Sequence, residues 1–288
     1  MNKLYINFLV IAFSLILSIF TLSQARNGTF VNRGLESLEN ATSNTVSVDE
    51  PTNQEQKQTE VNIIDTRSTR NIVNSVVYIE VTSCPGDGIS DYIAAGSGSN
   101  IDQRGLVLTN YHVIEGCRGD IYIGVTSSPD QDPELKYIAE VVTFDRDLDL
   151  AVLNITKSIP GNSNFTGNDL AYLSIGNSDF TSLGDDIDVW GYPGSRGDNT
   201  GQSRINITKG TVSGIDSYKG YRRGWIISDV NLTWGNSGGA ALNNDNELIG
   251  IPTEGRGVGM GAGVLGALRP VNLALDLIED ARNITGKK

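Results

Sequence analysis

Two segments of the 288-residue chain carry side chains that could cooperate in nucleophilic catalysis. The single histidine of the chain, His112, lies in LTNYHVIEGC, and imidazole readily accepts a proton near neutral pH. Ser237 lies in the glycine-rich stretch GNSGG, where missing Cβ atoms let backbone N–H groups converge and a substrate approach closely. A serine hydroxyl becomes a nucleophile when such a base takes its proton, so this pair suggests acyl transfer.

The order of these residues along the chain separates two kinds of hydrolase. GNSGG also satisfies the G-x-S-x-G pattern of α/β-hydrolases, in which the histidine follows the serine. No histidine follows Ser237, so the order must be histidine first and serine last. The acid should lie between them, in DRDLDLAVL. Asp149 precedes the apolar run LAVL, which would bury its carboxylate against the imidazole, whereas Asp145 and Asp147 are expected to be solvated turn residues.

The elements that would position these residues are mostly short strands. Apolar runs between turn residues indicate strands at 75–81, 105–110, 120–125, 138–144, 150–155, 186–192, 207–215 and 225–230, and the two runs AAL and ELIGI follow within 240–251, before the glycine-rich 255–266. A helical spacing of apolar residues occurs at 271–283, after Pro270, and briefly at 111–115. Many short strands with few helices predict an all-β sandwich or a pair of barrels.

The first 66 residues differ in composition from the rest of the chain. Residues 1–25 combine Lys3, an apolar stretch and small residues at the end, which is typical of an export signal or of an uncleaved N-terminal anchor. Residues 26–66 are rich in Asn, Thr, Ser, Glu and Gln, which predicts a disordered linker or pro-segment. We therefore expect a secreted, periplasmic or cell-surface protein, bound to a membrane only if residues 1–25 are retained.

The charge and the cysteine content narrow the classes of partner and site. A net charge of -12, with 22 Lys and Arg, argues against a nucleic-acid binder, because such affinity comes from cations on phosphates. One histidine excludes metal sites that need two imidazoles. In an oxidising compartment Cys84 and Cys117 should form a disulfide. Closing a loop of about 33 residues would stabilise the fold by about 3 to 4 kcal/mol.

The three motifs TNYHVIEG, DLDLAVL and GNSGGAAL resemble those of trypsin-like serine endopeptidases, most closely the Deg/HtrA branch, and GSG at 96–98 also fits. The resemblance spans about residues 70–280. It implies a domain at 67–288 made of two six-stranded antiparallel β-barrels, at about 70–160 and 165–270, with the crossing near 157–170. A C-terminal helix at 271–284 should follow.

The resemblance also implies roles for individual residues. Ser237 would be the nucleophile, His112 the general base and Asp149 the carboxylate that orients the imidazole. The backbone N–H groups of Gly235 and Ser237 would form the oxyanion hole. Protein or peptide substrates are expected, and no metal or organic cofactor is required. Deg relatives are often trimers, but the oligomeric state of this chain does not follow from its sequence.

Primary specificity is inferred from the positions that form the pocket in similar peptidases. Asn231 would lie at its base, with walls from Ile251, Thr253 and Glu254 and from the glycine-rich 257–263. A neutral base offers no carboxylate to Lys or Arg, so we expect cleavage after small or medium aliphatic residues.

Several positions depart from the family pattern without removing a catalytic group. Trp234 and Ala240 replace the usual prolines, and Asn236 replaces the aspartate needed for activation by a new N-terminus. The roughly 50 residues after Ser237 are expected to hold no PDZ domain. The alternatives to an endopeptidase are a catalytically silent binding module with the same fold and an esterase with the same triad.

Overall fold

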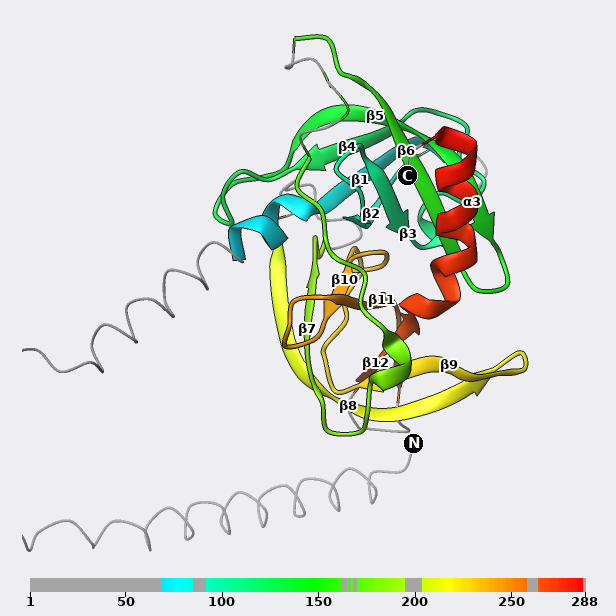
Figure 1. The fold of residues 1–288 in the computed structure, drawn as a ribbon. Helices are drawn as coiled ribbons and strands as arrows, with labels where there is room; N and C mark the ends of the chain where they lie inside the picture. Colours follow the sequence, from blue (N-terminus) through cyan, green and yellow to red (C-terminus); the bar gives the residue numbers. More distant parts are fainter. Residues whose placement is uncertain are drawn as a thin grey trace, which may run out of the picture. The chain divides into compact units, whose positions relative to one another are not determined.

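The computed structural model describes residues 69–84, 92–161, 165, 167, 170–194, 204–257 and 264–286, all within one compact unit of the chain. Their strands form two closed six-stranded barrels in which neighbouring strands are antiparallel (Figure 1). The predicted all-β class, two such barrels followed by a C-terminal helix, is confirmed. The predicted signal or anchor (1–25) and linker (26–66) lie outside the described residues.

The first barrel has the strand order β1-β2-β3-β6-β5-β4. Its strands are β1 (Val76–Cys84), β2 (Tyr92–Asn100), β3 (Leu106–Thr109), β4 (Ile121–Val125), β5 (Glu134–Asp145) and β6 (Leu150–Ser158). Strand β6 begins with a continuous apolar run because both of its faces are buried. Ala151 and Leu153 pack inside the barrel, while Leu150 and Val152 join the hydrophobic cluster shared with the second barrel.

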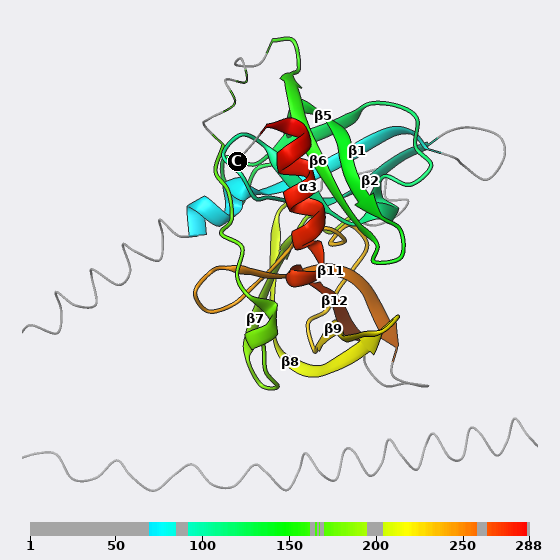
Figure 2. The same ribbon diagram turned by 45° about the vertical axis from the view of Figure 1, so that its right-hand side comes forward.

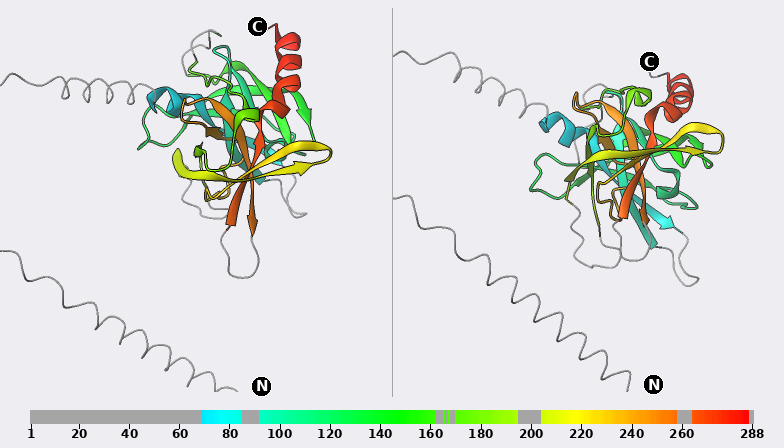
Figure 3. Two further views of the ribbon diagram at one scale, coloured as in Figure 1. Left: turned by 60° about the horizontal axis from the view of Figure 1, so that its bottom comes forward. Right: turned by 90° about the horizontal axis from the view of Figure 1, so that it is seen from below.

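The second barrel has the strand order β10-β11-β12-β9-β8-β7. Its strands are β7 (Asp186–Gly191), β8 (Asn206–Tyr218), β9 (Tyr221–Ser228), β10 (Ala240–Leu242), β11 (Leu248–Gly257) and β12 (Val264–Pro270). Strands β8 and β9 form a long hairpin, drawn in yellow in Figure 3. Lys219 and Gly220 at its tip both have positive φ, as a tight hairpin turn requires. Lys219 also forms an ion pair with Asp147 of the first barrel.

Strand β2 was not predicted from the sequence, because its residues show no apolar alternation. Ser97 and Ser99 are fully buried. A Cβ at Gly98 would lie 2.5 Å from Val107 Cγ1, and one at Gly96 would lie 2.8 Å from Val113 Cγ1. The barrel is therefore too tight here for large side chains, and small residues replace the usual pattern. A helical segment at 69–75 was also not predicted.

The C-terminal helix returns from the second barrel to the first. Residues Val271–Ala274 form a 3-10 turn, η3, and α3 (Leu275–Thr285) then packs on β5 and β6, as Figure 2 shows. Thr143 Oγ1 of β5 donates to the Leu277 carbonyl at 2.9 Å. In the described part of the chain, no helix is long and apolar enough to cross a membrane.

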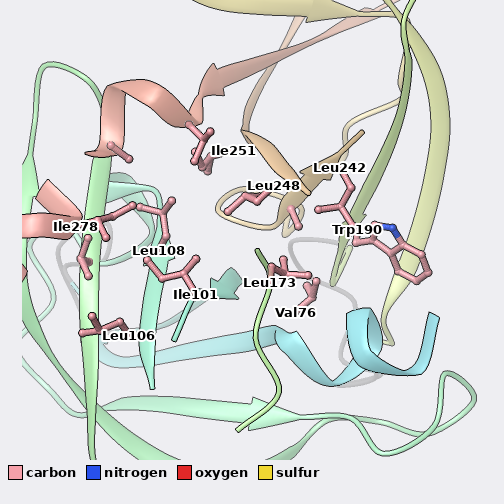
Figure 4. Packing of buried hydrophobic residues seen from close by; sticks show 14 of the residues in the cluster. Val76, Ile101, Leu106, Leu108, Leu173, Trp190, Leu242, Leu248, Ile251 and Ile278 are labelled. Carbon is pink, nitrogen blue, oxygen red and sulfur yellow. The ribbon is translucent and has the colours of Figure 1, made fainter. Parts of the chain in front are cut away.

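A hydrophobic cluster joins both barrels and the C-terminal helix (Figure 4). Its members come from the first barrel, the second barrel and α3, and include Leu106, Leu108, Trp190, Leu242, Leu248, Ile251 and Ile278. Polar contacts reinforce this junction. The Tyr192 hydroxyl bonds to Thr126 Oγ1 at 2.7 Å and donates to the Val76 carbonyl at 3.2 Å. Burial raises the pKa of Tyr192 to about 12.

Candidate active site

His112 is held at the end of β3 in a short 3-10 turn, η1 (Tyr111–Val113). The neighbours of His112 on both sides, Tyr111 and Val113, are buried, so their side chains point into the protein. The His112 side chain remains 44% exposed. Gly96 of β2 makes this packing feasible, because any Cβ at that position would collide with Val113. The fold therefore presents the imidazole at the surface while anchoring its neighbours.

Asp149 contacts His112 through both carboxylate oxygens. Oδ1 accepts the His112 backbone N–H at 2.8 Å, and Oδ2 lies 2.7 Å from His112 Nδ1. Asp149 precedes β6 in the left-handed region at φ 56°, which short polar side chains tolerate better than most. Its buried neighbours Leu148 and Leu150 hold that geometry. The predicted pair is thus brought together by a constrained turn.

Asp145 ends β5 and Asp147 lies in the turn that leads to Asp149, and the described contacts join neither of them to His112. The Asp145 carboxylate accepts the backbone N–H groups of Asp147 and Leu148. Asp147 is largely exposed and binds Lys219. Both aspartates therefore shape the turn or its surface.

Ser237 lies in the turn between Trp234 and β10, on the second barrel. Gly235 and Gly238 have φ of 92° and 83°, a region that favours glycine. A Cβ at Gly238 would lie 2.3 Å from the Ser97 carbonyl oxygen, so the turn also presses against β2. The Ser97 N–H donates to the Ser237 carbonyl at 2.9 Å. The glycines of GNSGG thus allow the serine to sit against the first barrel.

The backbone N–H groups of Gly235 and Ser237 have no acceptor among the described residues. The Trp234 carbonyl accepts from Gly194 N at 2.8 Å, and the Asn236 carbonyl accepts from Gly239 N at 3.0 Å. In a trans peptide the C=O and N–H point in opposite directions, so each of the two N–H groups points away from these internal contacts. Two such donors beside a serine could stabilise a developing oxyanion.

The Ser237 hydroxyl is engaged elsewhere than with the histidine. Its Oγ donates to the Thr253 carbonyl at 3.2 Å, and within the described part of the chain it makes no hydrogen bond to His112. The structure therefore joins His112 to Asp149 directly, while Ser237 is joined to the first barrel through its backbone.

The four residues expected to form the specificity pocket occupy different environments. Asn231 is exposed, whereas Ile251 is fully buried in the hydrophobic cluster between the barrels. Thr253 is buried and its hydroxyl donates to the Ile251 carbonyl. Glu254 is exposed and bound by Arg256 at 2.8 Å. Most of the glycine-rich wall, 258–263, lies outside the described residues.

Sequence reasoning gave no role to two residues that hold the site together. Ser97 Oγ donates to the Gly235 carbonyl at 2.6 Å and accepts the Tyr192 N–H at 2.8 Å. Asn110 Nδ2 donates to the Asp149 carbonyl at 2.8 Å and to Thr253 Oγ1 at 3.1 Å. The signal was present in the motifs, because Asn110 precedes YHV and Ser97 is the centre of GSG. Each bridges the two barrels.

The predicted disulfide between Cys84 and Cys117 is present. It connects the end of β1 to the segment that follows η1, so it restrains the turn that carries His112. Across the described ranges, no group of three or more His, Cys, Asp or Glu side chains is placed to hold a metal ion.

Comparison with known proteins relates this chain to a peptidase family. Residues 96–251 match the family described as a trypsin-like peptidase domain. A protein of Rickettsia prowazekii named probable periplasmic serine endoprotease DegP-like is 29% identical over 192 residues, 65% of this chain and 33% of that protein. Putative protease Do-like 13 of Arabidopsis thaliana is 32% identical over 199 residues, 65% of this chain and 36% of that protein.

The chain spans about a third of the length of these relatives. The matched family covers the His, Asp and Ser motifs, and it ends within β11. These matches confirm the resemblance that the three motifs predict.

Proposed function

This chain belongs to the trypsin-like peptidase domain family, and from that premise we propose that it is a serine endopeptidase acting through His112, Asp149 and Ser237. The observation that carries the proposal is the double contact of Asp149 with His112, and it is supported by the N–H groups of Gly235 and Ser237, which have no acceptor among the described residues. No metal or organic cofactor is required for this chemistry.

The first step is proton transfer from Ser237 to His112. Asp149 accepts from Nδ1, which leaves Nε2 of the neutral imidazole as the acceptor for the serine proton. Ser237 Oγ must leave the Thr253 carbonyl, turn toward Nε2 and attack the substrate carbonyl carbon. The imidazolium then protonates the leaving amine, and water hydrolyses the acyl-enzyme by the same steps.

The charge on the tetrahedral intermediate would be stabilised by the Gly235 and Ser237 N–H groups. Both are fixed before substrate arrives, because internal hydrogen bonds orient their peptides. Preorganised donors need no rearrangement when the charge develops, and losing one costs about 3 to 4 kcal/mol where this has been measured.

We propose that the substrates are proteins or peptides cleaved after small or medium aliphatic residues. Asn231 carries no charge, and the Glu254 carboxylate is already paired with Arg256. The histidine that could hold an acidic substrate side chain is absent, since His112 is the only one in the chain. Profiling with a peptide library should therefore show weak cleavage after Lys, Arg and Glu.

Export of the protein is also part of the proposal. Several relatives are named probable periplasmic serine endoproteases, and the disulfide between Cys84 and Cys117 is typical of an oxidising compartment. Fractionation of cells that make the full chain should find it outside the cytoplasm.

One contact favours a second candidate function, a catalytically silent binding module. Ser237 Oγ donates to Thr253 rather than to the imidazole. In that case the fold would bind peptides without cleaving them.

Hydrolysis of a protein substrate by the full chain and by Ser237→Ala separates the two functions. The endopeptidase predicts turnover that the variant loses by several orders of magnitude. Ser217→Ala is the matched control, because Ser217 is exposed on β8 and should keep full activity. Binding of uncleaved peptide by both the parent and Ser237→Ala would support the silent module instead.

A further inference from the structure

An open cavity lies where the C-terminal helix meets the segment that connects the two barrels. Its volume is about 570 Å³, which is within the range of pockets that bind ligands. It is lined by residues 172–177 of the connecting segment, by Ile101 after β2, and by Asn272, Leu275 and Arg282 of η3 and α3. The three candidate catalytic residues are not among these described residues, so the cavity is separate from the candidate active site.

Arg282 of α3 borders this cavity, and its positive charge has no partner in the described part of the chain. Its Nε is buried without a hydrogen bond, and no ion pair joins the guanidinium to a described carboxylate. Asp102, which follows Ile101 of the cavity wall, is instead bound by Arg104 through Nε at 3.0 Å and Nη2 at 3.1 Å. A guanidinium matches the two oxygens of a carboxylate. The cavity therefore offers a carboxylate ligand a binding group that the protein leaves unpaired.

Leu275 lies two helical turns before Arg282 and makes one end of the cavity apolar. Residues seven apart share a face of a helix, so these two side chains border the cavity about 10 Å apart along the axis. Leu275 is 43% exposed and Tyr172 is 46% exposed, although both side chains are large and hydrophobic. Ile101 and Leu173, labelled in Figure 4, are buried parts of the wall. Three residues of an extended peptide span the same 10 Å.

The connecting segment also carries backbone groups that a peptide could bind. Ile175 forms a parallel bridge with Leu248 of β11. In this bridge Leu248 accepts from the Gly176 N–H at 2.9 Å and donates to the Ser174 carbonyl at 2.8 Å. Backbone groups of successive residues in an extended chain point to opposite sides, so those of Ile175 point away from β11. They have no backbone partner among the described residues. An added peptide strand can bond to such groups, whereas a fatty acid cannot.

We propose that this cavity binds the C-terminal end of a peptide whose last residues are apolar. The terminal carboxylate pairs with Arg282, the apolar side chains pack against Leu275 and Tyr172, and the peptide backbone bonds to Ile175. The site and its test do not require the proposed function, because hydrolysis takes no part in either. Cleavage of proteins after aliphatic residues would, however, create chain ends of this kind.

The test uses the peptide acetyl-Ala-Leu-Val, titrated by calorimetry into the full chain carrying Ser237→Ala so that the peptide cannot be cleaved. The form with a free carboxylate should bind, and the form with a C-terminal amide should bind about 10- to 100-fold more weakly, because the bond to the guanidinium is lost. Adding Arg282→Gln should weaken binding of the free acid to a similar degree. Arg222→Gln is the matched control, because Arg222 is exposed on β9, and it should leave the affinity unchanged.

A photoreactive analogue of leucine in the same peptide locates the bound chain. Cross-links should map to residues 172–177 or to α3, and cross-links confined to the turn that carries Ser237 would overturn the proposal. Equal affinities of the free acid and the amide would also overturn it, and this comparison needs no variant at Arg282. Octanoate separates the two sources of an apolar carboxylate. If octanoate binds as tightly as the peptide, a peptide is the wrong ligand.

Discussion

The Ser97 hydroxyl offers a sharp test of how the barrels position the site. It donates to the Gly235 carbonyl at 2.6 Å and accepts the Tyr192 N–H at 2.8 Å. It therefore connects β2 of the first barrel to the turn that carries Ser237. Ser97→Ala removes both bonds and leaves two polar groups at the barrel junction without a partner, while Ser97 itself has no proposed chemical role.

The expected magnitude follows from these two contacts. Each lost hydrogen bond to a group that stays buried costs about 1 kcal/mol, so unfolding should become easier by about 2 kcal/mol. For a domain of this size the melting temperature should fall by about 4 to 8 °C. The freed Gly235–Asn236 peptide lies between the peptides that carry the two proposed oxyanion donors, so their positions should become less fixed and kcat should fall by about 10- to 100-fold.

Ser99→Ala is the matched control for this substitution. Ser99 lies on the same strand and is equally buried, but its hydroxyl has no partner among the described residues. Because that buried hydroxyl has no partner, its loss should not destabilise the fold. Thermal unfolding and peptide hydrolysis check both variants. If Ser97→Ala melts and turns over substrate like Ser99→Ala, the bridging role of Ser97 is wrong.

Three other predictions follow from the same structure. Asp149→Asn should lower kcat/KM by about 10⁴-fold, because an amide donating to His112 Nδ1 would force the proton onto Nε2, and steady-state rates near those of the parent would contradict this. The Tyr192 pKa of about 12 lies above its ordinary value, so its contribution to stability is present below pH 10 and lost as pH rises toward 12. Burial also raises the pKa of Tyr78, so chemical denaturation at alkaline pH should show a smaller loss in Tyr192→Phe than in the parent, and equal slopes would refute the role of Tyr192. Reduction of the Cys84–Cys117 disulfide should lower activity by loosening the turn that carries His112, and unchanged kinetics in reductant would count against that link.

The sequence predicts most strands because each apolar run reports burial on a sheet. LAVL in β6 is such a run, since alternate residues of it enter two different cores. Strand β2 is not predicted in this way. The space around Gly96 and Gly98 admits no larger residue, so the strand lacks the apolar pattern on which the prediction depends. A strand that is buried through glycine and serine residues shows no alternation of large apolar side chains in the sequence.

The candidate site, like the fold, has some residues that the sequence predicts and others that it does not. Residue types and their order suffice to nominate His112, Asp149 and Ser237 as candidates, and the structure joins two of them, His112 and Asp149, directly. The pocket residues illustrate the limit. Ile251 and Glu254 are both expected in its wall, but the register of β11 shifts between Pro252 and Glu254, so strand alternation in the sequence does not show which of these residues face the pocket. Hydrogen bonds from Asn110 depend on how two barrels meet, which no local pattern encodes.

The central claim is that Ser237 is an activated nucleophile beside a formed oxyanion hole. A fluorophosphonate reacts with such a serine irreversibly, so intact-mass measurement of the labelled full chain tests the claim directly. The account predicts a single adduct, mapped to the peptide containing Ser237, that is absent from Ser237→Ala and much slower to form in Asp149→Asn. No adduct on the folded protein, or equal labelling of Ser237→Ala, would contradict it.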